Sequence, residues 1–358
     1  MKVVFISNNL ASNHDKNRIE EFASNGVEVI VYGFTRTADD DRIRESSFYT
    51  PIVVGNIKPS YKSRIKTYWK AIKEIREKHK SDNSIFYLFG FDLGLCFMLQ
   101  RNQENYIYEE ADLVYTYIRN KLLVKLLKYL DEIVIKRSYR TILTSEGFIK
   151  YHFPFLKPNN LLLIENKLSE LINECKEVSK EHFTNRPLKI GFVGAPRFNS
   201  ILNFIKVFCT TFPEYEFHVY GAPVPESFSC LKSLRNCIFH GRFTSPIDLP
   251  AIYENIDLVL CTYDVTSDNV KYAEPNKIYE SIYFETPIIV SKGTFLSEKV
   301  DRLGIGFSID AMNDEEVVRF IKNITKKDIA LKMEKTRQIP KVECVNNNAS
   351  LIKELLRM

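Results

Sequence analysis

Short apolar runs alternate with longer amphipathic segments along the whole chain. Residues 3–7 and 85–89 are typical of the runs, and polar turn residues or glycines follow them. Such runs indicate strands that are buried on both faces, while the segments between them have helical periodicity. This alternation predicts parallel sheets that helices cover on both faces.

The pattern places strands in two successive groups, with helices between them. In the first half we expect strands at residues 3–7, 27–32, 52–54, 85–89, 106–109, 141–144 and 161–164. In the second half we expect them at residues 188–193, 216–220, 237–239, 258–261, 288–290 and 306–309. Helices are expected at residues 17–24, 115–137, 200–211, 246–254, 276–284 and 314–324, and in two pieces over 333–358, broken near Pro340.

These elements form an α/β chain of two doubly wound, Rossmann-like domains that face a cleft. We predict an N-terminal domain at residues 1–166, a linker at 167–187, a C-terminal domain at 188–335 and a C-terminal helical segment at 336–358. The linker prediction rests on the polar, charged run from Asn166 to Arg186, which has no strand pattern and which Pro187 closes.

Composition narrows the class of protein. With 358 residues, 45% hydrophobic and 27% charged, the chain is typical of a soluble globular protein. Its first residues resemble a strand rather than a signal peptide, and no apolar run approaches the roughly 18–20 residues of a membrane span. The seven cysteines are scattered. We therefore expect reduced thiols and a cytoplasmic location.

The net charge of +5 is modest, and we expect no nucleic-acid partner. Residues 58–80, however, hold nine basic residues against two glutamates, with Tyr68, Trp69, Ile72 and Ile75 at helical spacing. A basic amphipathic helix of this kind, with Trp69 on its apolar side, suits contact with an anionic membrane surface. The alternative is an ordinary surface helix that packs its apolar stripe on the sheet.

The sequence lacks the motifs of several common cofactor and catalytic sites. Neither first strand-to-helix turn contains G-x-G-x-x-G, which argues against a dinucleotide cofactor, and no P-loop or G-x-S-x-G elbow occurs. The six histidines are spread widely, so we expect no metal site. Glycines instead follow strands of the second half, at Gly194, Gly221 and Gly241. They suit either the close approach of a ligand or turn geometry alone.

The most specific segment is Glu274-Pro275-Asn276-Lys277-Ile278-Tyr279-Glu280, where a loop becomes a helix. Ligands of open α/β sheets bind beyond the carboxyl ends of strands, where helix N-termini favour anions. Lys277 suits a phosphate, and Glu280 suits the vicinal hydroxyls of a ribose. Gly194 and Arg197 form a turn that suits a diphosphate. We therefore predict a nucleotide-sugar site.

Two groups of carboxylates have alternative interpretations. Glu109, Glu110 and Asp112 follow a strand of the first domain, where one would bind acceptor hydroxyls or act as a base. Alternatively, they cap and charge the first turn of the next helix. Glu274 suits the hydroxyls of a transferred sugar, and its alternative is a solvent-exposed loop carboxylate.

Four segments of the chain resemble motifs of one known family: Ser7-Asn8 with Asp15 and Arg18, Ile107 to Asp112, Thr144 to Phe148, and Pro275 to Glu280 followed by Thr286-Pro287-Ile288-Ile289. The last is similar to the donor motif P-N-K-x-x-E…P-x-I. Over essentially its full length the chain resembles the GT-B-fold retaining glycosyltransferases of the large family 4 type, which includes many bacterial capsule and lipopolysaccharide assembly enzymes.

The resemblance implies a hexosyltransferase that uses a UDP- or GDP-linked sugar as cosubstrate and needs no cofactor or metal. Glu280 would hold the ribose hydroxyls, and Arg197 with Lys277 would stabilise the leaving diphosphate. The acceptor would be a polysaccharide or oligosaccharide, lipid-linked and presented at the inner face of the membrane. The C-terminal helix would return to the N-terminal domain.

The chain also departs from the family pattern. The two glutamates of the family motif are eight positions apart, which would place the first at Tyr272 rather than at Glu274. Ala111 stands where a histidine is common, and both the Gly-rich first loop and the lysine that follows the diphosphate arginine are absent. These departures leave two alternatives: a non-catalytic scaffold that binds sugar nucleotides, and a sugar-nucleotide epimerase.

Overall fold

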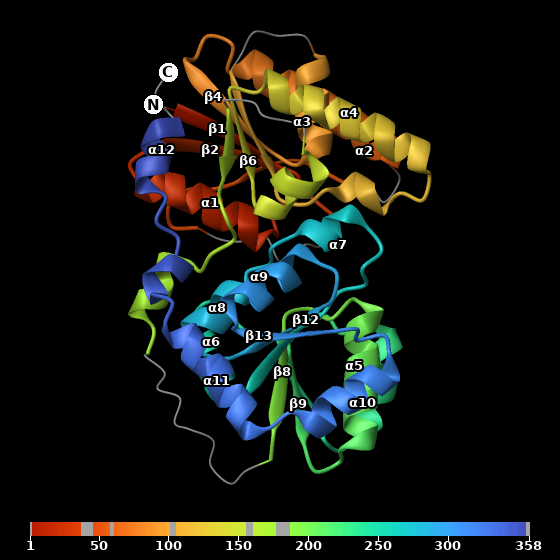
Figure 1. Ribbon diagram of the computed structural model, residues 1–358. Coiled ribbons are helices and arrows are strands. Elements are labelled where there is room, and N and C mark those ends of the chain that lie inside the picture. The colour runs from red at the N-terminus through yellow and green to blue at the C-terminus, as the bar shows by residue number, and fades with distance from the viewer. Residues whose placement is uncertain are drawn as a thin grey trace. The chain divides into compact units, whose positions relative to one another are not determined.

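Two parallel sheets, each covered by helices, organise the chain in the computed structural model (Figure 1). The structure describes residues 2–36, 46–57, 61–100, 105–154, 160–176 and 187–355. One unit comprises Met1–Glu165 with Asn347–Met358, and the other comprises Asn166–Asn346. The fold class predicted from the sequence is confirmed, and every predicted strand is present with similar bounds.

The first unit holds a seven-stranded sheet in the order β3-β2-β1-β4-β5-β6-β7. All neighbouring strands are parallel, and their chain order reverses between β1 and β4. The strands are β1 (Lys2–Ser7), β2 (Glu28–Thr35), β3 (Ile52–Asn56), β4 (Ser84–Phe89), β5 (Tyr106–Glu110), β6 (Arg140–Leu143) and β7 (Leu161–Leu163). Alternate residues of the central strands enter different cores because successive side chains point to opposite faces.

Helices cover both faces of this sheet. They are α1 (Asn13–Ser24), α2 (Tyr61–Lys78), α3 (Phe91–Leu99), α4 (Lys121–Arg137) and α12 (Ala349–Leu355), with short helices η1 (Val114–Tyr117) and η2 (Phe148–His152). The C-terminal helix α12 returns to the N-terminal unit, as predicted, and packs beside α1. Ile352 and Leu355 are buried in the same core as Phe5 and Phe22, and Asn348 Nδ2 donates to Glu21 Oε1 at 2.7 Å.

The second unit holds a six-stranded sheet in the order β10-β9-β8-β11-β12-β13. Its strands are β8 (Lys189–Val193), β9 (Glu216–Tyr220), β10 (Cys237–Gly241), β11 (Leu258–Cys261), β12 (Ile288–Ser291) and β13 (Gly306–Ile309). Its helices are α5 (Asn199–Thr211), α6 (Leu249–Glu254), α7 (Asp268–Tyr272), α8 (Lys277–Tyr283), α9 (Phe295–Leu303), α10 (Asp314–Asn323) and α11 (Lys326–Arg337), with η3 (Glu170–Glu174), η4 (Glu226–Ser233) and η5 (Lys341–Cys344).

The start of the predicted linker is part of the second unit. Leu168 and Ile172 are buried in the core that α6 and α8 share with the sheet. Leu168 also pairs with the segment that leaves the unit, since its N–H donates to the carbonyl of Cys344 at 2.9 Å and its carbonyl accepts from Asn346 at 2.8 Å. Residues 177–186 of the predicted linker and 356–358 of the C-terminal segment lie outside the described residues.

Capping residues explain where two helices depart from the pattern. Helix α1 begins at Asn13 rather than at residue 17, because the Ser12 side chain accepts from the N–H of Asp15. The helix expected at residues 115–137 begins only at Lys121, because Asn120 caps α4 by accepting from Leu122 and Leu123. The apolar pattern does not single out α3, α7 or α9.

The basic segment at residues 58–80 forms α2, although Lys58 lies outside the described residues. Tyr68, Ile72 and Ile75 are buried, and Tyr68 packs edge-on against Phe34 of β2. Trp69 is 41% exposed, so its expected place on the apolar side is wrong. Consecutive residues of a helix point about 100° apart, which turns Trp69 away from the stripe. These contacts agree with an ordinary surface helix.

Candidate functional site

The three predicted site glycines, Gly194, Gly221 and Gly241, lie at the carboxyl ends of adjacent strands of the second unit. Gly194 N–H donates to the Tyr220 carbonyl at 2.7 Å, and Gly221 N–H donates to the Gly241 carbonyl at 2.7 Å. All three have positive φ, at 136°, 140° and 78°. A Cβ at Gly221 would lie 2.0 Å from the Gly194 carbonyl oxygen, so the protein's own backbone demands glycine there. At Gly241 nothing lies within 4 Å of a Cβ.

Lys277 and Glu280 form an ion pair one turn apart on α8. Lys277 Nζ lies 2.8 Å from Glu280 Oε1, and both side chains are largely buried. The helix presents them because Ile278 and Ile282 pack into the core on its other side. Both charges lie close enough to Cys261, at the end of β11, to act on its pKa. Because β11 is the neighbour of β8, the pair lies near the reversal of strand order, where open α/β sheets bind ligands.

A third side chain, Tyr253 of α6, fixes Glu280. Its hydroxyl donates to Glu280 Oε2 at 2.6 Å. Burial, with the adjacent Glu280 charge, raises the pKa of Tyr253 well above its usual value, so the phenol stays a donor. A carboxylate offers about four acceptor positions, of which Lys277 and Tyr253 occupy two. The remaining two suit a vicinal diol.

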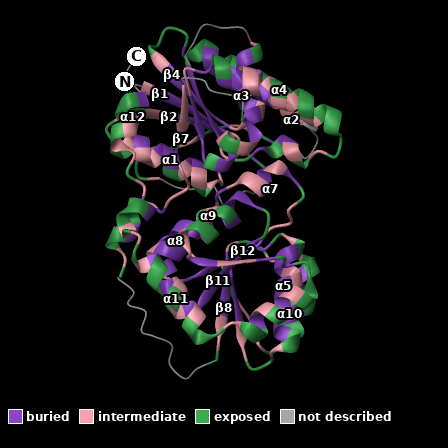
Figure 2. Cartoon of the chain, viewed as in Figure 1, coloured by how far each residue is buried: buried purple, intermediate pink, exposed green. Residues whose placement is uncertain are grey.

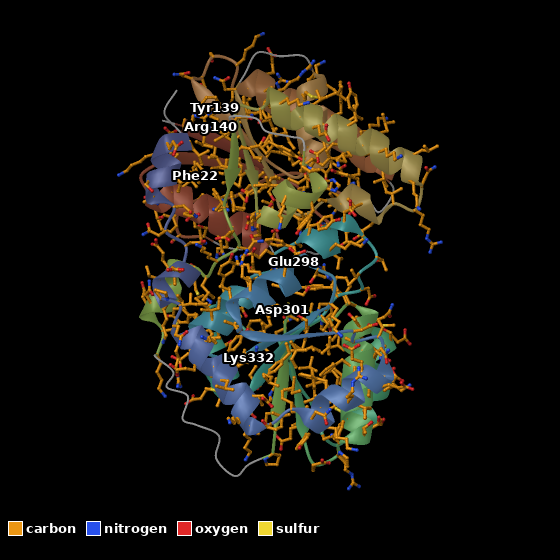
Figure 3. All side chains as sticks on the ribbon, viewed as in Figure 1. Phe22, Tyr139, Arg140, Glu298, Asp301 and Lys332 are labelled. Carbon is orange, nitrogen blue, oxygen red and sulfur yellow. The ribbon has the colours of Figure 1, made fainter. Side chains whose placement is uncertain are left out.

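Glu274 has a different environment from the one its loop position suggests. It is only 2% exposed, so the alternative of a solvent-exposed carboxylate is wrong. Lys299 Nζ lies 2.5 Å from its Oε1, and the Tyr279 hydroxyl donates to the same oxygen. Lys299 follows Glu298 on α9 (Figure 3) and also lies over the Tyr279 ring. Sequence reasoning did not identify Lys299, because nothing in the motif links α9 to residue 274.

Arg197 lies in the turn between Gly194 and α5, and its side chain is exposed. Its guanidinium lies 5.1 Å from the centre of the Phe198 ring, and no carboxylate of the described part of the chain pairs with it. The first amides of α5 are already occupied, since Asn199 and Ser200 N–H donate to the Asp264 carboxylate at 3.0 and 2.7 Å. Asn276 is exposed at the start of α8, and its side chain makes no capping bond.

In the first unit, Glu109 at the end of β5 is buried among cations. Arg18 Nε lies 3.2 Å from Glu109 Oε2, to which the Tyr87 hydroxyl also donates, and His14 Nε2 lies 2.8 Å from Oε1. Burial alone would raise the pKa of Glu109, but the charges of Arg18 and His14 outweigh it and lower that pKa to about 2. The carboxylate is therefore ionised and held at the carboxyl end of β5.

His14 is the functional candidate that sequence reasoning missed in this unit. Its side chain is 28% exposed, unlike that of Glu109. Burial alone would lower the pKa of His14, but the charge and hydrogen bond of Glu109 outweigh it, so the pKa is raised. Its position in the first turn of the helix after the first strand, with Ser12 as cap, is the signal that the sequence offers.

The neighbouring carboxyls of this unit do not cap a helix. Asn120 caps α4, and Leu113 precedes η1 without a side-chain capping bond, so that alternative is wrong. Asp112 is exposed in the loop. Glu110 points to the opposite face of the sheet from Glu109, where neither carboxyl oxygen has a hydrogen-bond partner among the described residues. Burial and the charges of Asp131, Asp92 and Asp112 raise its pKa well above the usual value.

No group of three or more His, Cys, Asp or Glu side chains in the described residues is arranged to hold a metal ion. No described helix combines the length and the apolar character that crossing a bilayer requires.

Comparison with known proteins identifies the fold. No protein-family model matches the sequence, and no curated protein sequence matches it. Sucrose-phosphate synthase from Thermosynechococcus elongatus matches with a TM-score of 0.72 at 12% identity, over 99% of this chain and 97% of that one. The chain has the GT-B fold.

Two further solved structures agree with this GT-B assignment. HepE from Anabaena, in complex with UDP-glucose, matches with a TM-score of 0.66 at 13% identity, over 99% of both chains. WaaG, a glycosyltransferase involved in lipopolysaccharide biosynthesis, matches with a TM-score of 0.65 at 13% identity, over 98% of both chains. At these identities the likeness establishes the fold, while activity has to be argued from the site.

Proposed function

We propose that this GT-B protein is a glycosyltransferase of the hexosyltransferase class, which uses a UDP- or GDP-linked sugar as donor. The observation that carries the proposal is the Glu280 carboxylate, held by Lys277 at 2.8 Å and by Tyr253 at 2.6 Å with two acceptor positions left over. The fold likeness to HepE, which was solved with UDP-glucose, supports the same class of ligand.

Each predicted site residue has a role in this proposal. Glu280 accepts hydrogen bonds from the ribose hydroxyls, and Glu274 from the hydroxyls of the transferred sugar. Arg197 and Lys277 stabilise the diphosphate, with Lys277 shared between Glu280 and the phosphate. The backbone at Gly194, Gly221 and Gly241 and the Asn276 amide contact the rest of the donor. Glu109 and Asp112 in the first unit are acceptor-side residues.

The proposed reaction retains the configuration of the sugar. A bond forms between an acceptor oxygen and the anomeric carbon while the bond from that carbon to the β-phosphate oxygen breaks on the same face. The acceptor proton passes to the departing phosphate oxygen, so no dedicated base is required. Arg197 and Lys277 lower the barrier because their charges lie where negative charge develops.

The acceptor in this proposal is a growing surface polysaccharide or oligosaccharide, of the capsule or lipopolysaccharide type and lipid-linked. The likeness to WaaG supports the proposal at the level of fold. The protein would then act in the cytoplasm at the inner face of the cell membrane. Membrane contact through residues 58–80 was part of this prediction, but the burial of Tyr68, Ile72 and Ile75 gives it no support.

Incubation of the purified protein with a panel of UDP- and GDP-linked sugars and a lipid-linked oligosaccharide extract tests this proposal. We expect nucleoside diphosphate release that depends on the extract, and a product whose anomeric proton coupling matches that of the donor. A product of opposite configuration would contradict retention. Donor binding without release or transfer would favour the non-catalytic scaffold, and interconversion of the sugar without an acceptor would favour the epimerase.

A further inference from the structure

The first half of helix α4 is apolar but lies outside the core of its unit. None of residues 121–130 is buried, although seven of these ten residues are Leu, Val or Tyr. The buried residues of α4 are Asp131, Val134 and Ile135, all in its second half. Figure 2 shows exposed and half-buried residues along this helix. An amphipathic surface helix normally buries its apolar stripe, whereas no described residue of this unit covers the first half of α4.

The exposed side chains form one continuous stripe. Leu122, Leu126 and Tyr129 are 78%, 53% and 62% exposed. Their spacings of four and three residues place them on the same side of the helix. Leu123 on α4 and Val114 and Tyr117 on the adjacent η1 are also exposed. We call these six residues the η1–α4 face. Exposed apolar patches of this kind mark interaction sites.

The charges around the η1–α4 face are mainly positive. Residues 113–130 contain Arg119, Lys121, Lys125 and Lys128 and no Asp or Glu, while Asp112 and Glu132 lie just beyond the two ends of this segment. Arg119, Lys121 and Lys125 are exposed, while the Lys128 ammonium donates to the carbonyl of His152. An apolar stripe bordered mainly by cations is complementary to an anionic bilayer, whose phosphates attract the cations and whose interface accepts the apolar side chains.

The helix is fixed to its unit rather than loosely attached. Asp131 accepts hydrogen bonds from Tyr108 at 2.8 Å and from Tyr115 at 2.9 Å. Tyr108 belongs to the interior strand β5, and Tyr115 belongs to η1, so one carboxyl joins α4, η1 and the sheet. Val134 and Ile135 are fully buried beside it. The apolar side chains are therefore presented on a rigid support.

We propose that the η1–α4 face docks the protein on an anionic membrane surface, with Leu122, Leu126 and Tyr129 in the interface and the basic side chains at the lipid phosphates. This inference deepens the membrane part of the proposed function and replaces residues 58–80 as the point of contact. It does not depend on catalysis, because vesicle binding is measured without donor or acceptor.

Sedimentation with vesicles of phosphatidylcholine, with and without 30% phosphatidylglycerol, tests the docking surface. We expect the parent to bind the anionic vesicles only, and salt to weaken this binding. The Leu122→Gln/Leu126→Gln variant should bind them at least about tenfold more weakly. Matched controls are Leu331→Gln, a leucine on α11 that is 57% exposed, and Lys66→Gln/Lys70→Gln/Lys73→Gln on α2. We expect both controls to bind as the parent does.

A second measurement uses the single tryptophan. In the Trp69→Phe background, Leu126→Trp should shift its emission to the blue on addition of anionic vesicles, whereas Trp69 in the parent should not. Equal binding to both vesicle types, binding lost only in the α2 variant, or an unshifted Trp at position 126 would overturn the proposal. Loss of self-association in the Leu122→Gln/Leu126→Gln variant, without any vesicle binding by the parent, would assign the face to a second copy of the chain.

Discussion

The hydroxyl of Tyr253 donates to the carboxylate of Glu280 at 2.6 Å, although the two residues lie on different helices of the second unit. The bond fixes one oxygen of the residue that we assign to the donor ribose. Lys277 fixes the other at 2.8 Å. Glu280 is thus oriented before a ligand arrives, which lowers the entropic cost of binding.

Removal of the Tyr253 hydroxyl should weaken donor binding. A hydrogen bond to a charged group contributes roughly 1.5–3 kcal/mol, so we expect Tyr253→Phe to weaken nucleotide binding by about tenfold. Titration calorimetry measures this. Tyr215→Phe, a conservative change among the phenylalanines of the α5 core, is the matched control. Unchanged affinity in Tyr253→Phe would show that Glu280 needs no second support.

Substitution of the exposed Arg197 should change turnover without changing stability. Arg197 is exposed and unpaired among the described residues, so Arg197→Ala should leave the melting temperature unchanged. If the guanidinium supplies roughly 3 kcal/mol to the leaving diphosphate, turnover should fall by about 10²-fold or more. Lys277→Ala should lower turnover similarly and also lower stability, because it leaves Glu280 buried without its cation. Normal turnover in a folded Arg197→Ala protein would contradict the assignment of Arg197 to the leaving diphosphate.

The Glu274–Lys299 pair has either a structural or a donor-binding role, and a double-mutant cycle distinguishes them. Close charge pairs with shared partners show coupling of roughly 0.5–3 kcal/mol. We expect Glu274→Gln and Lys299→Met to be coupled in both stability and turnover, because the carboxylate is 2% exposed and its Oε1 lies 2.5 Å from Lys299 Nζ. Coupling in stability alone, with normal turnover, would make Glu274 purely structural.

The stability of the first unit should fall as the pH rises toward 8. Burial raises the pKa of Asp131 from 3.8 to about 8, an effect that the Tyr115 hydrogen bond only partly reduces. The native unit then holds a proton that the unfolded chain has lost, so its free energy of unfolding decreases between these pH values. The slope is at most about 1.4 kcal/mol per pH unit for one group.

Trp69 is the only tryptophan and lies in the first unit, so its fluorescence reports the unfolding of that unit. Denaturant titrations at several pH values should show a smaller slope in Asp131→Asn than in the parent. Asp82→Asn, a surface carboxyl whose pKa its partner Lys2 lowers, should keep the parent slope. An unchanged slope in Asp131→Asn would show that the buried carboxyl titrates normally.

Strand positions were predictable because the strands are short apolar runs, most of which are buried on both faces, although β3 at the sheet edge exposes Ile52 and Val53. The bounds of the helices were less predictable, because they depend on single capping residues such as Ser12 and Asn120 rather than on periodicity. Trp69 shows the same limit, since helical spacing is too coarse to decide on which side of Tyr68 the core lies.

The polar residues of the site were predictable as a local motif, whereas their partners were not. Lys277 and Glu280 are three positions apart and meet as helical neighbours. Tyr253, Lys299 and His14 reach their carboxylates across 27, 25 and 95 positions, and only the folded sheet brings them together. The exposure of the η1–α4 face was hidden for the same reason, because an apolar helix has the same sequence whether or not something covers it.

The most direct test of the account is a calorimetric titration of UDP-, GDP-, ADP- and CMP-linked sugars into the parent protein and the Glu280→Gln variant. We predict that the parent binds a UDP- or GDP-linked sugar and that Glu280→Gln weakens this binding at least about tenfold with little loss of stability. Glu254→Gln, an exposed carboxyl beside Tyr253, should bind as the parent does. Equal affinity in the parent and Glu280→Gln, or no binding of any nucleotide sugar, would contradict the assignment of this site to the donor.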